Sequence, residues 1–317
     1  MIEKNLLKSI EEKKRKLDGL RPLDRHQLAL LKREIEIEYV YNSTSIEGNS
    51  LTLDETRLVL EEGITIKGKP MREHFDVINQ KEAMETLESW VRGKRKGIEE
   101  GDILQLHAIT LRGISKEWAG RYKTVPNRVL GSSVKRTPPY LVKEEMEKLV
   151  VFINKNPERL HPIELAAVAH QMLAKIHPFL DGNGRCARLL SNLMLMRNGY
   201  PPNTILNKER KKYFGTLESA HLGKREPFVN FFARGVERML DIYLNALTPT
   251  TKENELVPLS ELAKGTGHTQ EYLSLLARKG RLSAVKLDGV WHSSIERFKE
   301  YENARKRRGR SSRIRAK

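Results

Sequence analysis

The chain has 317 residues, 38% of them hydrophobic, a length and composition that allow about two globular domains with sizeable cores. Its single cysteine, Cys186, excludes an intramolecular disulfide framework, and without a signal-peptide pattern or a run of roughly 20 apolar residues we expect a soluble cytoplasmic protein that does not enter membranes. The formal net charge of +17 at pH 7 favours nucleic acid, nucleotide or another anion as a partner.

Helical periodicity dominates the chain up to about residue 247. The segment RHQLALLKREIEIEYVY, residues 25–41, places apolar residues three and four apart and predicts one amphipathic helix that ends near NSTSIEGNS. A second helix is expected after Thr52, where TLDE matches a capping box, and Gly63 is expected to end it. Further helices are predicted around residues 72–92, 102–112, 142–155, 162–176, 185–198 and 226–246. The predicted fold class is therefore mainly α.

Residues 120–140, GRYKTVPNRVLGSSVKRTPPY, interrupt the helices with short β-prone pieces on either side of GSS. We interpret this segment as a β-hairpin or extended flap in an otherwise helical domain. The next interruption is LTPTTKEN, residues 247–254, whose threonines, proline and charges are typical of a linker. The large domain is therefore expected to end near residue 247.

The C-terminal part has a different pattern. LSELAKGTGHTQEYLSLLARKG predicts two helices joined by a glycine-containing turn, and RLSAVKLDGVWHSS predicts a hairpin that turns at Asp288 and Gly289. Helix-turn-helix and hairpin together predict a winged helix. The end of the chain, RKRRGRSSRIRAK at residues 305–317, carries eight Lys or Arg and no acid, which predicts a disordered basic tail that serves either solubility or nucleic-acid binding.

A polar loop within IHPFLDGNGRCARLL, residues 176–190, separates two apolar helices of the large domain. Pro178 prevents simple continuation of the first helix, so His177 is expected at its end. The glycines and asparagine of residues 182–184 open the next helix, where free backbone amides and the helix dipole favour an anion. The loop therefore predicts a phosphate-binding site.

Charged and titratable side chains surround this predicted site. Arg185 and Arg188 are neighbours on the first turns of the helix. Asp181 supplies a hard oxygen ligand that, with phosphate oxygens and water, suits Mg²⁺. His177 has an ordinary pKa close enough to neutrality for a general base. Each residue alone has a structural alternative, as a helix end or a turn, but their combination at this spacing favours phosphoryl chemistry.

The segment HPFLDGNGRCAR, residues 177–188, matches the signature of Fic-domain proteins, His-x-Phe-x-(Asp or Glu)-Gly-Asn-Gly-Arg-x-x-Arg, at every specified position. The resemblance extends upstream to SIEGNSLTLDET and DVINQKEAM, and covers roughly residues 25–245. It implies a Fic-type helical bundle with a β-hairpin flap that docks an extended segment of the target by strand addition. It also implies adenylylation, the transfer of AMP from ATP to a Ser, Thr or Tyr hydroxyl of a protein.

The resemblance implies a role for each motif residue. His177 would take the proton from the target hydroxyl, and Asp181 would hold Mg²⁺ against the α- and β-phosphates. Phe179 would fix the loop by packing. Nucleotide contacts are implied for Gly182, Asn183, Gly184, Arg185 and Arg188, with Arg188 at the γ-phosphate, and weaker contacts to the nucleoside are expected for Asn192 and Tyr213.

A second motif precedes the loop in the sequence. Ser43-x-x-x-Glu47-Gly48 matches the inhibitory motif of the family, (Ser or Thr)-x-x-x-Glu-(Gly or Asn), in the N-terminal helical region. By resemblance, Glu47 would pair with Arg188 and occupy the guanidinium that the γ-phosphate needs, a strong and directional contact. In some relatives the same glutamate serves the removal of AMP, and that alternative stays open here. A homodimer is a further open alternative.

Four regions are therefore expected: an N-terminal helical region with the inhibitory motif at residues 1–100, a Fic catalytic core at 101–247, a winged helix-turn-helix at 248–302 and a basic disordered tail at 303–317. Residues 256–302 resemble the winged-helix family of excisionase-like proteins, so a DNA-binding regulator with a secondary Fic domain is the main alternative function. DNA would be contacted through residues 256–317, although many such modules bind proteins or only pack against neighbouring domains. The proposed phosphate contacts are Arg278, Lys279, Arg281 and Lys286.

Two other chemistries have less support. A metal hydrolase built on His161, His170 and His177 lacks both an HExxH arrangement and a second carboxylate, so we interpret His170 as a core histidine. Cys186 lies near His177 in the sequence but at an unspecified position of the motif, so we interpret it as core filler and not as a nucleophile.

Overall fold

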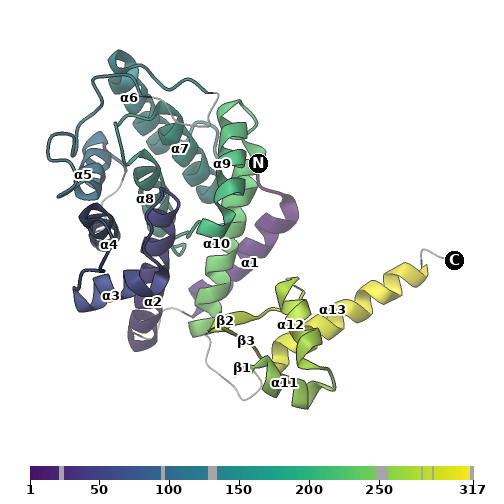
Figure 1. Cartoon of the computed structure of the whole chain (residues 1–317). Coiled ribbons are helices and arrows are strands. Elements are labelled where there is room, and N and C mark those ends of the chain that lie inside the picture. Colours follow the sequence, from purple (N-terminus) through teal and green to yellow (C-terminus); the bar gives the residue numbers. More distant parts are fainter. Residues whose placement is uncertain are drawn as a thin grey trace. The chain divides into compact units, whose positions relative to one another are not determined.

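The computed structural model describes residues 1–20, 25–93, 97–127, 134–247, 256–279, 281–287 and 289–314. The chain divides into two compact units, Met1–Leu247 and Thr248–Lys317. The described residues of the first unit form α1 (Lys4–Gly19), α2 (Arg25–Ser45), α3 (Leu53–Glu62), α4 (Met71–Arg92), α5 (Glu100–Thr110), α6 (Pro139–Lys155), α7 (Pro162–Ile176), α8 (Asn183–Arg197), the 3-10 helix η1 (Asn207–Glu209), α9 (Arg210–His221) and α10 (Glu226–Leu247) (Figure 1).

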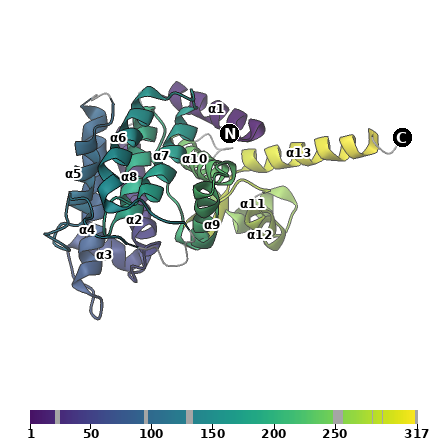
Figure 2. The same cartoon turned by 90° about the horizontal axis from the view of Figure 1, so that it is seen from above.

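Helices α7 and α8 form the centre of the first unit. Helix α8 packs against α7, α4 and α5, while α7 also contacts α6, α9 and α10 (Figures 1 and 2). Most residues of both helices are buried, because each helix is covered on several sides by other helices. The polar loop between α7 and α8 is therefore held between two of the most deeply packed elements of the unit.

The helices predicted between residues 25 and 247 are all present in the structure, with ends shifted by up to three residues. The capping box at Thr52 is confirmed: its hydroxyl accepts from the Glu55 amide at 3.1 Å, and the Glu55 carboxylate accepts from the Thr52 amide at 2.8 Å. Gly63 ends α3 in the left-handed conformation, with φ of 66°. Helices α1 and α9 were not predicted.

The hairpin predicted for residues 120–140 is not formed in the described residues 120–127 and 134–138, which contain no β-strand. The backbone here bonds to the loop after α7 instead: the Lys123 amide donates to the Pro178 carbonyl at 2.9 Å, and the Asn127 side chain donates to the Phe179 carbonyl at 2.8 Å. Residues 128–133, which hold the predicted turn, lie outside the described residues. The described part is an extended segment fastened to the loop.

The second unit contains β1 (Val257–Pro258), α11 (Leu259–Thr266), α12 (Gln270–Arg278), β2 (Val285–Leu287), β3 (Val290–Ser293) and α13 (Ile295–Ile314). The strands form an antiparallel sheet in the order β1-β3-β2, and the pair Leu287↔Val290 leaves two residues between β2 and β3, as expected for the predicted two-residue turn. A separate apolar core joins these elements, with Leu259, Leu262, Leu273, Leu276 and Phe298 among its buried residues.

Part of the C-terminal tail that was predicted to be disordered lies within a helix. Helix α13 continues through residues 303–314, and residues 315–317 lie outside the described residues. Low hydrophobicity suggested disorder, but Arg, Lys and Ala are strong helix formers and extend a helix that begins in the packed part of the unit. Most of the linker predicted at residues 247–254 lies within residues 248–255, which are also outside the described residues.

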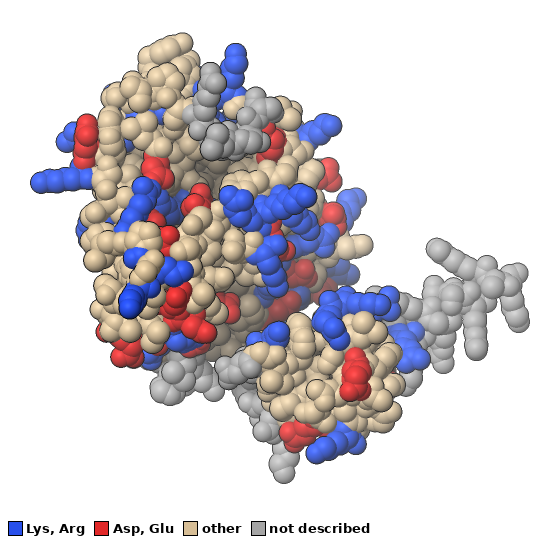
Figure 3. Space-filling model, viewed as in Figure 1, with Lys and Arg blue, Asp and Glu red and all other residues tan. Residues whose placement is uncertain are grey.

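Lys and Arg side chains occur across the visible face of each unit, with acidic side chains among them (Figure 3). Among the described helices, none combines the length and apolar composition that crossing a membrane requires.

Candidate active site

His177 ends α7 in an unusual backbone conformation. Its φ of 52° and ψ of 58° lie in the left-handed region, and its amide donates to the Leu173 carbonyl at 2.9 Å. Non-glycine residues adopt this conformation rarely, and they do so mostly in turns and functional sites. Because Pro178 disfavours the right-handed helical conformation at the residue before it, the sequence favours a helix end here. His177 is thus presented at the start of the loop.

The His177 imidazole is a neutral base. Burial, followed by the positive charges of Arg136 and Lys123, lowers the pKa of His177 to about 4. Lys123 is itself 3% exposed, its ammonium donates to Asn127 Oδ1 at 2.7 Å, and burial lowers the pKa of Lys123 to about 8. Arg136 donates to His221 Nδ1 at 3.1 Å. The extended segment 120–140 therefore places two cations near the histidine, which the sequence analysis did not foresee.

Phe179 fixes the loop by packing, as expected. Its ring is fully buried and stacks on the His107 ring, with centroids 3.6 Å apart and an interplanar angle of 7°. The Asn183 side chain accepts from the Phe179 amide at 2.9 Å and donates to the Phe179 carbonyl at 2.8 Å. Asn183 was predicted to bind phosphate, but its side chain is used within the loop, so only its backbone amide remains for an anion at the start of α8.

His107 of α5 contacts the loop, and the sequence did not predict it as a residue of the site. The Gly120 amide donates to His107 Nδ1 at 3.1 Å, so the ring proton is on Nε2, which donates to the Asp181 carbonyl at 3.1 Å. Burial lowers the pKa of His107 to about 4, which keeps this neutral tautomer at neutral pH. No local signal marks His107, because its partners follow it by 13 and 74 residues.

The start of α8 has the features that favour an anion, and a carboxylate approaches it. Gly182 precedes the helix with φ of 78°, and Gly184 lies directly beneath Glu47, since a Cβ atom at Gly184 would collide with Glu47 Oε1. Free amides of the first helical turn and the helix dipole favour a negative charge at this position. Two guanidinium nitrogens near this helix start, Nε of Arg185 and Nη1 of Arg188, have no hydrogen-bond partner among the described residues.

Arg188 is buried and pairs with the inhibitory motif. Its Nε donates to Ser43 Oγ at 2.9 Å, and its Nη2 donates to the Ser43 carbonyl at 2.7 Å and lies 2.8 Å from Glu47 Oε1. Although burial alone disfavours its charge, Glu47 and nearby tyrosines raise the pKa of Arg188. The geometry brings Ser43 and Glu47 together with Arg188. Gly48 follows with φ of 105°, a conformation that glycine adopts readily and that turns the chain after Glu47.

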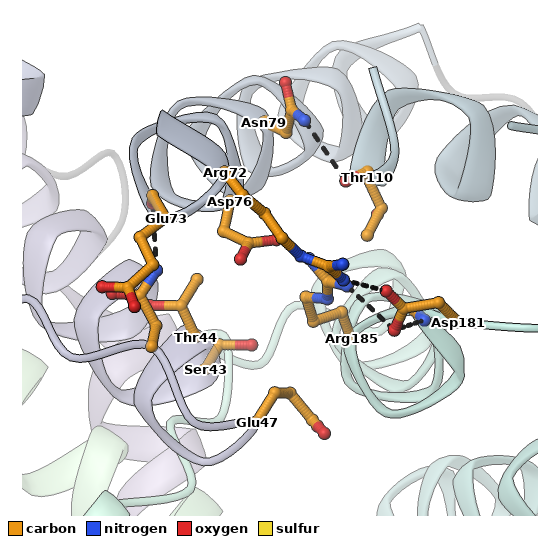
Figure 4. A network of polar contacts seen from close by, with 12 residues as sticks. Ser43, Thr44, Glu47, Arg72, Glu73, Asp76, Asn79, Thr110, Asp181 and Arg185 are labelled. Atoms are coloured by element: carbon orange, nitrogen blue, oxygen red, sulfur yellow. Dashed lines mark hydrogen bonds and ion pairs between the residues drawn. The ribbon is translucent and has the colours of Figure 1, made fainter. Parts of the chain in front are cut away.

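Asp181 projects from the loop toward Arg72 and Arg185 (Figure 4). Its Oδ1 accepts from the Gly182 amide at 2.6 Å and from Arg185 Nη2 at 3.3 Å, and its Oδ2 is bound by Arg72 of α4. Burial opposes ionisation, but Arg185, the Gly182 amide and Arg72 outweigh it and lower the pKa of Asp181. The side chain is therefore an ionised carboxylate, 46% exposed.

These residues fit Mg²⁺ that arrives with a nucleotide. A hard carboxylate ligand that remains accessible is the usual protein contribution when phosphate oxygens and water complete an octahedral shell. Among the described residues there is no group of three or more His, Cys, Asp or Glu able to hold a metal ion. Asp181 would therefore contribute the protein's carboxylate, and the remaining ligands would come from the nucleotide and water.

The position of Arg185 is fixed by an ion pair with a residue that was not predicted from the sequence. Its Nη1 binds Asp76 of α4, and the two side chains are 3% and 13% exposed. Burial raises the pKa of Asp76 despite the opposing charge of Arg185. The pair fixes the guanidinium at the base of α8, so its Nη2 reaches Asp181 Oδ1.

The predicted nucleoside contacts of Asn192 and Tyr213 find no support in their positions. Both are 1% exposed. Asn192 is bonded to the backbone of Asn203, at 2.8 and 3.1 Å, and the Tyr213 hydroxyl lies 2.9 Å from His170 Nε2. The family resemblance implied these contacts but did not show that both side chains are buried. His170 is a fully buried core histidine, and burial raises the pKa of the buried Cys186 thiol to about 12, consistent with a packing role.

Comparison with known proteins gives the family. The model of the Fic/DOC family matches residues 97–195, which include the whole loop. The solved structure of a Fic-1 fragment from Caenorhabditis elegans is 36% identical, covers 76% of this chain and 71% of that chain, and superimposes with a TM-score of 0.69. The chain belongs to the Fic/DOC family.

Other relatives of this Fic-family chain are bacterial and metazoan. A Fic domain-containing signalling protein from Bacteroides thetaiotaomicron is 29% identical, covers 77% of this chain and 98% of that chain, and gives a TM-score of 0.71. The protein adenylyltransferase Fic of Nematostella vectensis is 37% identical over 252 residues, which are 78% of this chain and 57% of that protein. The chain spans about half the length of the curated relatives that it matches.

Proposed function

We propose that this Fic-family chain is a protein adenylyltransferase, which transfers AMP from ATP to a Ser, Thr or Tyr hydroxyl and releases pyrophosphate. The curated relatives carry that name. The observation that carries the proposal is the arrangement of His177, Asp181 and the amides of residues 182–184 around one helix start. A base, an oxygen ligand and an anion site then lie within a single loop of the chain.

His177 would accept the hydroxyl proton as the hydroxyl oxygen attacks the α-phosphorus. Its low pKa keeps the imidazole neutral and able to accept, while a bound triphosphate would counter the charges of Arg136 and Lys123 and raise the basicity of the ring. Asp181 would hold Mg²⁺, which when bound neutralises charge on the phosphates. The amides at the start of α8 and Arg188 would orient the phosphate chain, because positioning and charge neutralisation dominate phosphoryl transfer.

We further propose that Glu47 inhibits this reaction. Its carboxylate lies over Gly184 at the start of α8 and pairs with Arg188, so it occupies the place and the guanidinium that an anionic phosphate would use. A bidentate or charge-assisted contact of this kind competes directly with phosphate. ATP would then bind in a productive pose only when Glu47 moves away. Removal of AMP from a modified protein, with Glu47 as a participant, stays a prediction.

Several expectations remain predictions: the winged-helix and DNA-binding role of the C-terminal unit, a homodimer and a cytoplasmic location. The test of the main proposal uses full-length protein carrying Glu47→Gly, incubated with Mg²⁺, ATP and a cell lysate. Mass spectrometry should find AMP on hydroxyl side chains of target proteins or of the chain itself. The double variant with His177→Ala serves as the matched control, and an equal yield of AMP from both would contradict the proposal.

A further inference from the structure

Arg72 lies at the first turn of α4 and reaches across to the loop, where its Nη2 binds Asp181 Oδ2 (Figure 4). The other carboxylate oxygen, Oδ1, is taken by the Gly182 amide at 2.6 Å and by Arg185 at 3.3 Å. The two oxygens of Asp181 thus have different partners. Oδ1 is bound from within the loop and α8, whereas the partner of Oδ2 comes from a different helix.

Arg72 occupies the oxygen that a metal ion would use. Mg²⁺ binds carboxylate oxygen at about 2.1 Å and requires an octahedral shell around itself. A guanidinium in contact with the same oxygen places a positive charge close to the ion and would repel it. Metal binding at Asp181 Oδ2 would therefore favour release of this oxygen by Arg72.

Arg72 is also the arginine at this loop that can move most easily. Its side chain is 57% exposed and that of Asp181 is 46% exposed, whereas Arg185 and Arg188 are 3% and 2% exposed. An ion pair this exposed contributes at most roughly fivefold to an equilibrium constant. The backbone beneath it is held firmly, because the Glu73 carbonyl accepts from Asn49 at 2.9 Å. The side chain can therefore leave Asp181 without movement of α4.

A new partner for Arg72 would arrive together with the metal. Mg²⁺ at Asp181 carries phosphate oxygens as its other ligands, so these oxygens lie next to the carboxylate that Arg72 has left. Guanidinium groups bind phosphate oxygens through strong charge-assisted hydrogen bonds. Asp76, one turn along α4, is the less available partner, since Arg185 already binds it.

We propose that Arg72 is a further nucleotide-binding residue that exchanges partners, binding Asp181 in the resting protein and the phosphate chain when Mg²⁺ and ATP bind. The proposal rests on the proposed function, because it requires a nucleotide at this loop. It assigns to α4 a direct role in substrate binding that is additional to the motif of residues 177–188.

The test compares full-length Arg72→Ala and Arg72→Lys in the Glu47→Gly background. Two affinities are measured: Mn²⁺ alone by electron paramagnetic resonance, and ATP with a chelator present by calorimetry. Arg112→Ala is the matched control, because Arg112 pairs with Glu82 of α4 and is 60% exposed. It removes the same charge from an equally exposed ion pair without a contact to the loop.

Arg72→Ala should bind Mn²⁺ about three- to fivefold more tightly and metal-free ATP several-fold more weakly. Arg72→Lys should fall between parent and alanine variant in both measurements, because it keeps the charge but loses the planar fork. The proposed exchange would be overturned if the affinities for Mn²⁺ and for metal-free ATP changed in the same direction in Arg72→Ala. It would also be overturned if Arg72→Lys bound both ligands as the parent does, or if Arg112→Ala gave equal changes. If the Glu47→Gly parent binds no ATP at all, the proposed function itself fails.

Discussion

Glu47→Gly is the substitution that most directly separates inhibition from catalysis. It removes the carboxylate that lies 2.8 Å from Arg188 Nη2 and over the start of α8. Arg188 itself should stay in place, because its hydrogen bonds to Ser43 Oγ and to the Ser43 carbonyl, at 2.9 and 2.7 Å, do not involve Glu47. The variant should therefore free the proposed phosphate site and leave Arg188 in position.

The expected increase in the rate of AMP transfer follows from the exposed fractions of Arg188 and Glu47. Arg188 is 2% exposed and Glu47 is 36% exposed, so the contact is neither fully buried nor a surface ion pair. A hydrogen bond to a charged group contributes about 1.5–3 kcal/mol, and the middle of that range, about 2 kcal/mol, corresponds to about 30-fold. We expect the rate of AMP transfer at subsaturating ATP to rise by about this factor.

The assay is the initial rate of label transfer from α-labelled ATP, together with thermal unfolding. Because Arg188 loses a partner, the variant should unfold at a lower temperature than the parent without nucleotide, and ATP with Mg²⁺ should stabilise it more than the parent. Glu62→Gly, at the exposed end of α3, is the control for loss of a glutamate outside the site. Equal rates in variant and parent, with normal folding, would refute competition by Glu47.

The other predictions concern the base, the anchor and the buried histidines. His177→Ala should abolish transfer while ATP affinity, measured by calorimetry, stays nearly unchanged, because the imidazole acts on the hydroxyl proton. Phe179→Ala should lower the free energy of unfolding by about 3–5 kcal/mol in a urea titration, since the ring is fully buried. Burial lowers the pKa values of His107, His177 and His221 to about 4, so the unfolded chain takes up protons from about pH 6.5 downward while the folded chain does not. The urea midpoint should therefore fall between pH 7 and pH 5, and a constant midpoint would contradict these shifts.

Local sequence signals predicted the helices that form the site. Strong helix formers in α7, Pro178 after it and the glycines before α8 each act over a few residues, so the loop and its ends could be placed from the sequence. The contact between Glu47 and Arg188 could be predicted only through the family motif, because nothing in their spacing shows that α2 lies against α8. The structure places them in contact.

The partners that the sequence did not reveal come from distant elements. Arg72 lies 109 residues before Asp181, as does Asp76 before Arg185, and such cross-helix pairs have no local pattern. The described residues of the predicted hairpin or flap contain no strand for a related reason: β-prone residues such as Val125 favour a strand, but Lys123 and Asn127 form hydrogen bonds to the loop at residues 178–179. In each case contacts between parts of the chain that are distant in sequence determined the structure, and no local pattern revealed them.

The central claim is that the loop at residues 177–188 transfers the AMP part of ATP to a protein hydroxyl. The most direct measurement incubates the Glu47→Gly variant with Mg²⁺ and ATP labelled at either the α- or the γ-phosphate, and then counts the label on protein. Retention of α-label without γ-label, lost in the double variant with His177→Ala, is the predicted result. Retention of γ-label, or of neither label on any protein of a whole lysate, would contradict it.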